Sequence, residues 1–533
     1  MNNHALNRNL IERVALGDLL RKRSRDSGEQ PAIVDFPAGE RRATSYNELN
    51  KRVNQLAHGL IAKGVKQGDK LALFSTNQRD MLTVYFACYK LGVIAVPINF
   101  MQGVDDVRYN LEHSETSAVV YEAMFAELVH ASTEDNPHIK LTVQMGNTKG
   151  KSDYSLEALL DNQSEQEIND RIIEDRDTAH MIYTSGTTSR PKAVESSHLA
   201  LTIAALTGAI ELELNRYNRM LLVLPLFHCA ALSVLHPVMM RGGCTVLHAA
   251  FDPNIIVDSL EQEKIETAVF MPMMWHALLA TPNVEQRDFK HFKLGVYSMA
   301  AMNSRSLEKV RKTFGCVMHL GSGQTEFAPV ACMYRDKTPT EFSEGNYWGE
   351  PVCTGEQAII DKQGNELPNG EAGEIVWRGP QVMSGYYKNE QATAEAGKFG
   401  WHHTGDIGLI DNQGQLLFID RIKDTIKSGG ENVSSQKVEQ ALELLEGIER
   451  AAAFGVSHPH WGEAVCACII SATLNESDIP QIEAHCKAQL GQFEVPKAIF
   501  ICETLPVTGT GKIRKVELRA QYKDLFIPIP VNN

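Results

Sequence analysis

The chain has 533 residues, of which 43% are hydrophobic, 22% charged and 7% aromatic. This length exceeds what one hydrophobic core supports, and this much apolar material excludes wholesale disorder, so we expect roughly two to four domains or subdomains. The net charge of −14 argues against a nucleic-acid partner, because such a surface needs clustered Lys and Arg.

The cysteines and the apolar stretches indicate a protein that stays in the cytoplasm. The ten cysteines are scattered without a CxxC pair, so we expect them to be reduced and mostly buried. The first residues, MNNHALNRNL, lack the basic-then-apolar pattern of a signal peptide. The most apolar stretch, Met220 to Met240, contains Pro225 and Pro237, which suits a buried strand, a loop and a helix better than a membrane span.

Short apolar runs alternate with helical patterns through about the first 420 residues. We predict a strand at 70–75, a helix over Met81–Leu91 and another strand at 92–99. The same runs return at HMIYTS (180–185), RMLLVLP (219–225), CTVLHA (244–249), TAVFMP (267–272) and LGVYSM (294–299). Strands separated by helices predict an α/β fold, with a large N-terminal domain (1–420) of parallel-rich sheets covered by helices.

A different pattern begins after Asp420. The segment DRIKDTIKSGGENVSSQKVEQALELL passes from a charged loop through a Gly-Gly turn into an amphipathic helix. Two apolar runs, AAAFGV and AVCACIISA, follow, then a helix around Ile482–Leu490 and the Gly-rich loop PVTGTGKIRK. We therefore predict a small, mobile α+β domain over 421–533.

The segment YTSGTTSRPKAV, from Tyr183 to Val194, has the composition of a phosphate-binding loop. Small residues let backbone N–H groups converge on phosphate oxygens, hydroxyls add donors, and Lys192 supplies charge. The pattern GxxxxGK[ST] is absent, which disfavours ordinary P-loop chemistry. The alternative is a polar surface loop. The candidate ATP-binding residues here are Thr184, Ser185, Gly186, Thr187, Thr188 and Lys192.

The block TSGTT-x-x-PK (184–192), taken with five later blocks, resembles the adenylate-forming superfamily of acyl-CoA synthetases, coumarate-CoA ligases, luciferases and peptide-synthetase adenylation domains. The later blocks are LPLFHCAAL (224–232), GSGQTE (321–326), GYYKN (385–389), GWHHTGDIG (400–408) and PVTGTGKIRK (506–515). They stand in the family's order, and the resemblance extends from about Ser45 to Lys515. It implies an ATP-dependent acid:CoA ligase that forms an acyl-adenylate and then a thioester.

The resemblance also implies a role for individual residues. Thr325 would contact the α-phosphate, and Glu326 would hold Mg²⁺, a hard cation that favours carboxylate oxygen. Lys512, in its Gly-flanked loop, would stabilise charge in the adenylation transition state. The other residues matched to the ATP site are Gly321, Asp406, Arg421, Lys427 and Asn432. Lys423 falls on the family's hinge, and Gly429 and Gly430 on the loop that meets the pantetheine arm of coenzyme A.

The residues expected to form the carboxylic-acid pocket match the motifs of the family less closely. Its candidate residues are His228, Ala230, Ala301, Gly321 and Ser322. Amino-acid-activating relatives carry Asp where this chain has His228, which argues against an α-amino acid. Small residues with the apolar Met299 and Met302 predict a roomy, mostly hydrophobic pocket. Medium-chain or long-chain fatty acids and aryl acids both fit, and carnitine-like acids stay open.

Several positions depart from the family pattern. Ser322 replaces the Tyr that commonly stacks on adenine, Ser189 and Ala193 replace Gly around the phosphate loop, and Ala250 replaces an Arg or Lys. Two other functions therefore stay open: adenylation with a carrier protein or oxygen as acceptor, and a nucleotide-binding pseudoenzyme. A homodimer is the default expectation for the oligomeric state.

Overall fold

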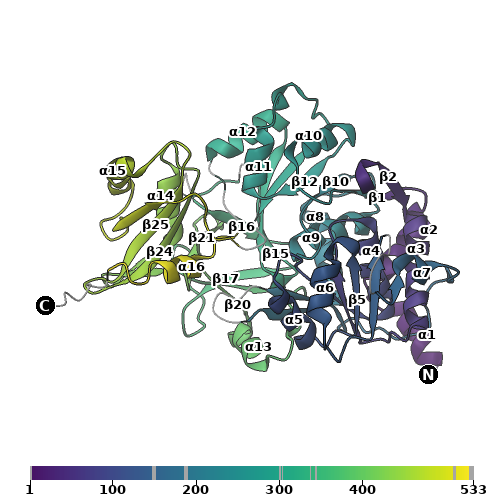
Figure 1. Ribbon diagram of the computed structural model, residues 1–533. Helices are drawn as coiled ribbons and strands as arrows, with labels where there is room; N and C mark the ends of the chain where they lie inside the picture. The colour runs from purple at the N-terminus through teal and green to yellow at the C-terminus, as the bar shows by residue number, and fades with distance from the viewer. Residues whose placement is uncertain are drawn as a thin grey trace.

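The structure is a computed structural model that describes residues 3–146, 152–184, 190–298, 302, 304–336, 338–341, 345–507 and 512–526. Its described strands form three sheets, of 13, eight and five strands. The two larger sheets belong to the N-terminal part of the chain, and the five-stranded sheet follows β21 near the C-terminus (Figure 1). The predicted fold class, α/β with a large N-terminal domain and a small C-terminal one, is confirmed.

The eight-stranded sheet is parallel at its centre. In spatial order its strands are β19 (Gly385–Tyr386), β9 (Lys192–Ser197), β8 (Thr178–Thr184), β4 (Ile94–Pro97), β3 (Lys70–Phe74), β5 (Ala118–Glu122), β6 (Leu141–Met145) and β7 (Tyr154–Ser155). Neighbours from β8 to β7 are parallel, whereas β8–β9 and β9–β19 are antiparallel. The predicted strands at 70–75 and 92–99 correspond to β3 and β4.

The 13-stranded sheet is mixed. In spatial order its strands are β17 (Glu356–Ile360), β18 (Gly373–Arg378), β20 (His402–Ile410), β21 (Leu416–Arg421), β16 (Tyr347–Pro351), β15 (Val330–Tyr334), β14 (Val317–Gly323), β13 (Leu294–Ser298), β12 (Thr267–Phe270), β10 (Arg219–Leu222), β11 (Cys244–Leu247), β1 (Pro31–Asp35) and β2 (Arg42–Ser45). The run from β14 to β1 is parallel, and both ends are antiparallel.

Helices cover these two sheets and fill the space between them. They are α1 (Asn3–Glu12), α2 (Asp18–Ser27), α3 (Tyr46–Ala62), α4 (Arg79–Leu91), α5 (Val104–His113), α6 (Ala126–Thr133), α7 (Leu156–Leu160), α8 (His198–Glu211), α9 (Cys229–Arg241), α10 (Pro253–Gln262), α11 (Pro272–Leu279), α12 (Ser304–Phe314) and α13 (Glu390–Ala396). Figure 1 shows α4, α8 and α9 between β5 of one sheet and β10 of the other. The apolar stretch 220–240 is thus a buried strand, a loop and the helix α9, as predicted.

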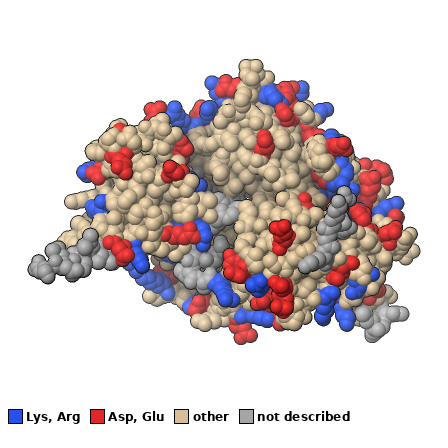
Figure 2. Space-filling model, in the orientation of Figure 1, with Lys and Arg blue, Asp and Glu red and all other residues tan. Residues whose placement is uncertain are grey.

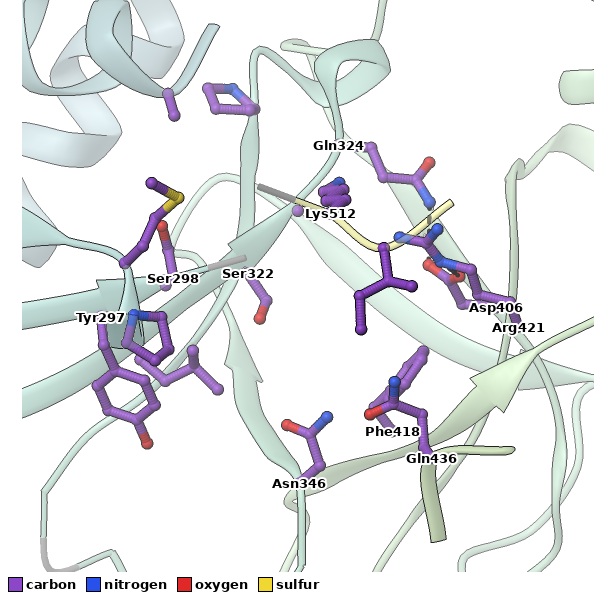
Figure 3. Close-up of a pocket in the computed structure, with 18 of the residues that line it drawn as sticks. Tyr297, Ser298, Ser322, Gln324, Asn346, Asp406, Phe418, Arg421, Gln436 and Lys512 are labelled. Carbon is purple, nitrogen blue, oxygen red and sulfur yellow. Dashed lines mark hydrogen bonds and ion pairs between the residues drawn. The ribbon is translucent and has the colours of Figure 1, made fainter. Parts of the chain in front are cut away.

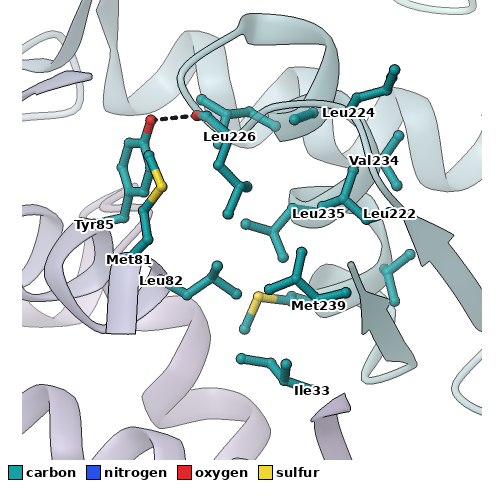
Figure 4. Packing of buried hydrophobic residues seen from close by; sticks show 14 of the residues in the cluster. Ile33, Met81, Leu82, Tyr85, Leu222, Leu224, Leu226, Val234, Leu235 and Met239 are labelled. Carbon is teal, nitrogen blue, oxygen red and sulfur yellow. Dashed lines mark hydrogen bonds between the residues drawn. The ribbon is translucent and has the colours of Figure 1, made fainter. Parts of the chain in front are cut away.

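The main hydrophobic core lies where α4 meets α9 and the end of β10 (Figure 4). Met81 and Leu82 of α4 face Leu235 and Met239 of α9, all essentially inaccessible to solvent. The Tyr85 hydroxyl donates a hydrogen bond to the carbonyl oxygen of Leu226 at 2.7 Å, which satisfies the one polar atom of this ring. This packing joins the two larger sheets into one body.

The five-stranded sheet consists of β22 (Ile426–Ser428), β23 (Glu431–Val433), β24 (Arg450–His458), β25 (Gly462–Ile470) and β26 (Ala498–Ile501). It packs with α14 (Ser435–Glu443), α15 (Ile479–Gln489) and α16 (Lys515–Gln521) around its own apolar clusters. We call this part the C-terminal unit. Among the described residues, no helix is long and apolar enough to cross a membrane. All ten cysteines are free thiols and eight of them are buried, as predicted.

Candidate active site

A cleft of about 3030 Å³ separates the large body from the C-terminal unit. Figure 2 shows its mouth as a hollow between the lobe that holds β24 and β25 and the rest of the molecule. Thr184, His228, Ser298 and Thr325, which line it, lie at or after the carboxyl ends of β8, β10, β13 and β14. Ligands of open α/β sheets bind at this edge. The fold therefore assembles the predicted blocks from distant parts of the chain.

The segment after β14 turns sharply at Gly323. A Cβ atom there would lie 1.7 Å from the carbonyl oxygen of Pro329, so no larger residue fits. The turn leads into a short 3-10 helix, Thr325–Phe327. The Thr325 hydroxyl lies 3.2 Å from Cys229 Sγ, and burial raises the pKa of that thiol to about 11, so it stays protonated. The predicted residues of this block line the cleft: Gly321, Ser322, Thr325 and Glu326.

Tyr386 connects Glu326 to the phosphate-loop lysine. Its hydroxyl donates to Glu326 Oε1 at 2.9 Å, and Lys192 Nζ lies 4.6 Å from the centre of its ring. Thr184 and Lys192 are paired across β8 and β9, so both flank the phosphate loop. The predicted residues Ser185, Gly186, Thr187 and Thr188 lie outside the described residues, as does Ser189. Among the described residues, Tyr386 is the one whose side chain bonds the Glu326 carboxylate, which leaves its second oxygen available to a ligand there.

Asp406 and Arg421 form a pair on adjacent strands. They are opposite each other in the β20–β21 register, with Arg421 Nε 3.7 Å from Asp406 Oδ1. Gln324 Nε2 donates to Asp406 Oδ2 at 3.0 Å and to the Thr404 carbonyl oxygen at 2.8 Å. Burial raises the pKa of Asp406 to about 6, although Arg421 and Lys512 oppose the shift. A carboxylate held in this way can accept hydrogen bonds from paired hydroxyls.

Lys512 reaches the same place from the C-terminal unit. Figure 3 shows it beside Gln324, Asp406 and Arg421, across from Ser322. The residue remains open to water, but the cleft walls remove much of its hydration and Arg421 lies near. These two effects lower the pKa of Lys512 to about 8. The ammonium thus faces the two groups of predicted ATP residues, Thr325–Glu326 and Asp406–Arg421.

His228 has a local role as well as a place in the cleft. Its Nδ1 accepts the backbone N–H of Ala230 at 3.1 Å and so caps α9. Desolvation, helped by Lys512, lowers the pKa of His228 to about 4, so at neutral pH the ring is uncharged and its proton sits on Nε2. Ala230, Gly321 and Ser322 line the cleft with it, and Ala301 lies outside the described residues.

The structure separates four predicted residues from this cleft. Lys427 and Asn432 pair across the β22–β23 hairpin, and Gly429 and Gly430 form its turn with φ of 63° and 90°. None of them is among the lining residues that the structure describes, whereas the predicted hinge Lys423 is. Near the C-terminal unit, Arg421, Lys423 and Lys512 thus line the cleft, and roles for the hairpin residues stay predictions.

Two residues of the site were missed by the sequence analysis. Gln324 and Tyr386 were quoted inside the blocks GSGQTE and GYYKN but received no role. The structure gives each a hydrogen bond to a predicted site residue. The sequence did offer a reason to consider Gln324. It stands between Gly323 and the Thr325–Glu326 pair, and its side-chain amide can donate hydrogen bonds to a carboxylate.

Comparison with known proteins agrees with this geometry. Residues 20–387 match the family described as AMP-binding enzyme, and residues 437–512 match the AMP-binding enzyme C-terminal domain. The chain belongs to the AMP-binding enzyme family. The predicted recognition of the adenylate-forming superfamily is thereby confirmed.

Two relatives of this AMP-binding enzyme are CoA-thioester-forming. A feruloyl-CoA synthase from Amycolatopsis sp is 34% identical over 487 residues, which cover 90% of this chain and 94% of that protein. An indoleacetate–CoA ligase from Aromatoleum aromaticum is 29% identical over 498 residues, covering 93% and 96%. The crystal structure of ATP-bound MatB from Rhodopseudomonas palustris superposes with a TM-score of 0.85 at 25% identity and covers 96% and 99%.

Proposed function

We propose that this AMP-forming acid–CoA ligase activates an aryl carboxylic acid with ATP and transfers the acyl group to coenzyme A. The observation that carries the proposal is the meeting of Lys512, the Asp406–Arg421 pair and the Thr325–Glu326 turn in one cleft. Each group matches one part of a nucleoside triphosphate: ribose hydroxyls for the carboxylate, phosphates for the cations and hydroxyls.

In the first step, an oxygen of the substrate carboxylate attacks the α-phosphorus, and pyrophosphate leaves with the bridging oxygen. Lys512 stabilises the negative charge that develops at the α-phosphate and carboxylate, and Lys192 stabilises the departing phosphates. The residues present fit Mg²⁺: Glu326 has a carboxylate oxygen that no described residue bonds, and this ion is commonly held by one or two carboxylates together with substrate phosphates. When bound, Mg²⁺ neutralises phosphate charge.

In the second step, the sulfur of coenzyme A attacks the acyl carbon and AMP leaves. We propose that the C-terminal unit rotates about Lys423, which withdraws Lys512 and brings the Gly429–Gly430 turn to the cleft. That turn suits a slender pantetheine arm because it is exposed and has no side chains. A rotation of the C-terminal unit would let one cleft support the two reactions in succession.

An aryl acid with a polar ring substituent fits the wall formed by α8. The lining residues Ala204, Thr207, Gly208 and Glu211 follow one face of this helix over seven residues, about 10 Å at 1.5 Å per residue. The far end is polar, because the buried Glu211 carboxylate accepts the Cys353 N–H and pairs with Arg335. A polar ring substituent would lie beside these charged groups, whereas a plain alkyl chain could make no polar contact with them. The 34% identical feruloyl-CoA synthase supports the same class.

Pyrophosphate release from ATP and Mg²⁺ across a panel of carboxylic acids, with and without coenzyme A, tests the proposal. We expect sustained release that needs coenzyme A and is fastest with hydroxylated aryl acids. Fastest release with long-chain fatty acids would overturn the substrate class alone. Release of about one equivalent that coenzyme A does not change would point to another acceptor, such as a carrier protein. No release with any acid, despite ATP binding, would indicate a pseudoenzyme.

A further inference from the structure

A cluster of buried polar and charged side chains lies at the end of β21, at the edge of the cleft, and has no role in the chemistry described above. It consists of Asp420, Ser435, Glu439 and Lys515, whose exposed fractions are 2%, 0%, 6% and 7%. Buried charges are costly unless they are paired and hydrogen-bonded, so their position is strongly specified. Glu439 pairs directly with the Lys515 ammonium, whereas Asp420 is linked to it through Ser435.

The contacts run in a chain from Lys515 to Asp420. Lys515 Nζ lies 2.7 Å from Glu439 Oε1 and donates to Ser435 Oγ at 2.6 Å. Ser435 donates its hydroxyl to Asp420 Oδ1 at 3.0 Å and its backbone N–H to Asp420 Oδ2 at 2.5 Å. Asp420 Oδ1 also accepts the backbone N–H of Arg421 at 2.7 Å. Both carboxylate oxygens of Asp420 are thus used.

The two ends of this series of contacts, Asp420 and Lys515, lie next to active-site residues in the sequence. Asp420 precedes Arg421 on β21, and successive side chains of a strand point to opposite faces, so Arg421 reaches Asp406 while Asp420 reaches Ser435. Lys515 is three residues beyond Lys512, at the start of α16. The cluster therefore joins the strand that carries one nucleotide contact to the segment that carries the adenylation lysine.

We propose that Asp420 and Lys515 are positioning residues that hold Lys512 in the cleft during adenylation and must separate before thioester formation. This inference rests on the proposed function. Asp420 belongs to β21 of the large sheet, whereas Ser435, Glu439 and Lys515 belong to the C-terminal unit. A turn about Lys423 keeps the Lys515–Glu439 pair and breaks the Ser435–Asp420 contact. The Ser435–Asp420 contact thus stabilises the arrangement for adenylation relative to the arrangement for thioester formation.

The substitution Asp420→Asn isolates this contact. The amide oxygen can still accept the Arg421 N–H, but the amide nitrogen cannot accept the Ser435 N–H, and the charge that attracts Lys515 is lost. The matched control is Lys487→Met, an exposed lysine of the same unit that pairs with Glu483 on α15. Two readouts separate positioning from general damage: the two half-reactions measured apart, and the rate of trypsin cleavage within 421–427.

We expect Asp420→Asn to slow ATP–pyrophosphate exchange about tenfold while thioester formation from supplied acyl-adenylate is unchanged or faster. Trypsin should cut the 421–427 segment several times faster, and Lys487→Met should change neither readout. Equal losses in both half-reactions, or unchanged exchange, would overturn the inference. If the wild type forms no acyl-adenylate, the proposed function fails, and the trypsin comparison still decides whether Asp420 holds the two parts together.

Discussion

Gln324 Nε2 lies 3.0 Å from Asp406 Oδ2, which ties the turn after β14 to strand β20. Gln324 immediately precedes Thr325, while Asp406 pairs with Arg421 on the next strand. One amide side chain therefore fixes the phosphate-side turn relative to the ribose-side carboxylate. His402 Nε2 lies 3.4 Å from Gln324 Oε1, so the amide is held at its other end as well.

Replacing Gln324 by Leu should weaken ATP binding. The buried Asp406 carboxylate would lose a donor, at a cost of about 1 to 2 kcal/mol, which corresponds to a rise in KM for ATP of roughly tenfold. Steady-state kinetics at a saturating concentration of the carboxylic-acid substrate would measure this KM. Gln363→Leu, in an exposed turn, is the control and should leave KM unchanged. An unchanged KM in Gln324→Leu would show that Asp406 needs no such support.

Replacing Lys512 by Ala should damage the first half-reaction selectively. The ammonium faces the groups assigned to ATP, and loss of one preorganised charge from a transition state costs on the order of 10² to 10³ in rate. ATP–pyrophosphate exchange would report this loss, whereas thioester formation from supplied acyl-adenylate should change little. Equal losses in both half-reactions would remove Lys512 from its assigned role.

The adenylation rate should fall at alkaline pH. Desolvation and Arg421 lower the pKa of Lys512 to about 8, so the free enzyme loses this positive charge as pH rises through that value. We expect kcat/KM for ATP to decline above pH 8, since kcat/KM reports groups of the free enzyme. In Lys512→Arg, which stays charged, the decline should disappear from the residual activity. A profile that is flat to pH 9.5 in the wild type would contradict the prediction.

The folded state should lose stability below pH 6.5. Burial lowers the pKa of His180 and of His236 to about 3, against 6.5 in an unfolded chain. The unfolded state therefore binds more protons, and the stabilisation that is complete above pH 6.5 is lost as pH falls, by roughly 1.4 kcal/mol per histidine at pH 5.5. Urea unfolding at pH 7.5 and 5.5 measures the difference. His236→Phe should reduce this difference by about 1.4 kcal/mol, the share of one histidine, and an unchanged difference would count against the prediction.

Leu235→Ala should destabilise the protein without altering the cleft directly. Leu235 is fully buried between α4 and α9 (Figure 4), so its truncation leaves a cavity that costs about 2 to 5 kcal/mol. Leu206→Ala is the control, because Leu206 on α8 is 41% exposed and should change the free energy of unfolding by less than about 1 kcal/mol. Similar urea midpoints for the two variants would contradict the packing described.

The sequence by itself determined the fold class, the strands and the blocks that identify the family. Buried parallel strands are continuous apolar runs, and for that reason β3 and β4 lie within the predicted segments. Thr325, Asp406 and Lys512 were predicted because their blocks resemble those of the adenylate-forming superfamily, and each lines the cleft.

Only the tertiary structure decided which of these residues meet. The contacts of Tyr386 with Glu326 and of Lys515 with Ser435 join residues 60 and 80 positions apart, and no local pattern specifies them. The same holds for Lys427 and Asn432, whose distance from the cleft depends on how the C-terminal unit packs against β21. Local sequence fixes backbone conformation through propensity and burial pattern, whereas contacts between distant side chains arise only when whole elements pack together.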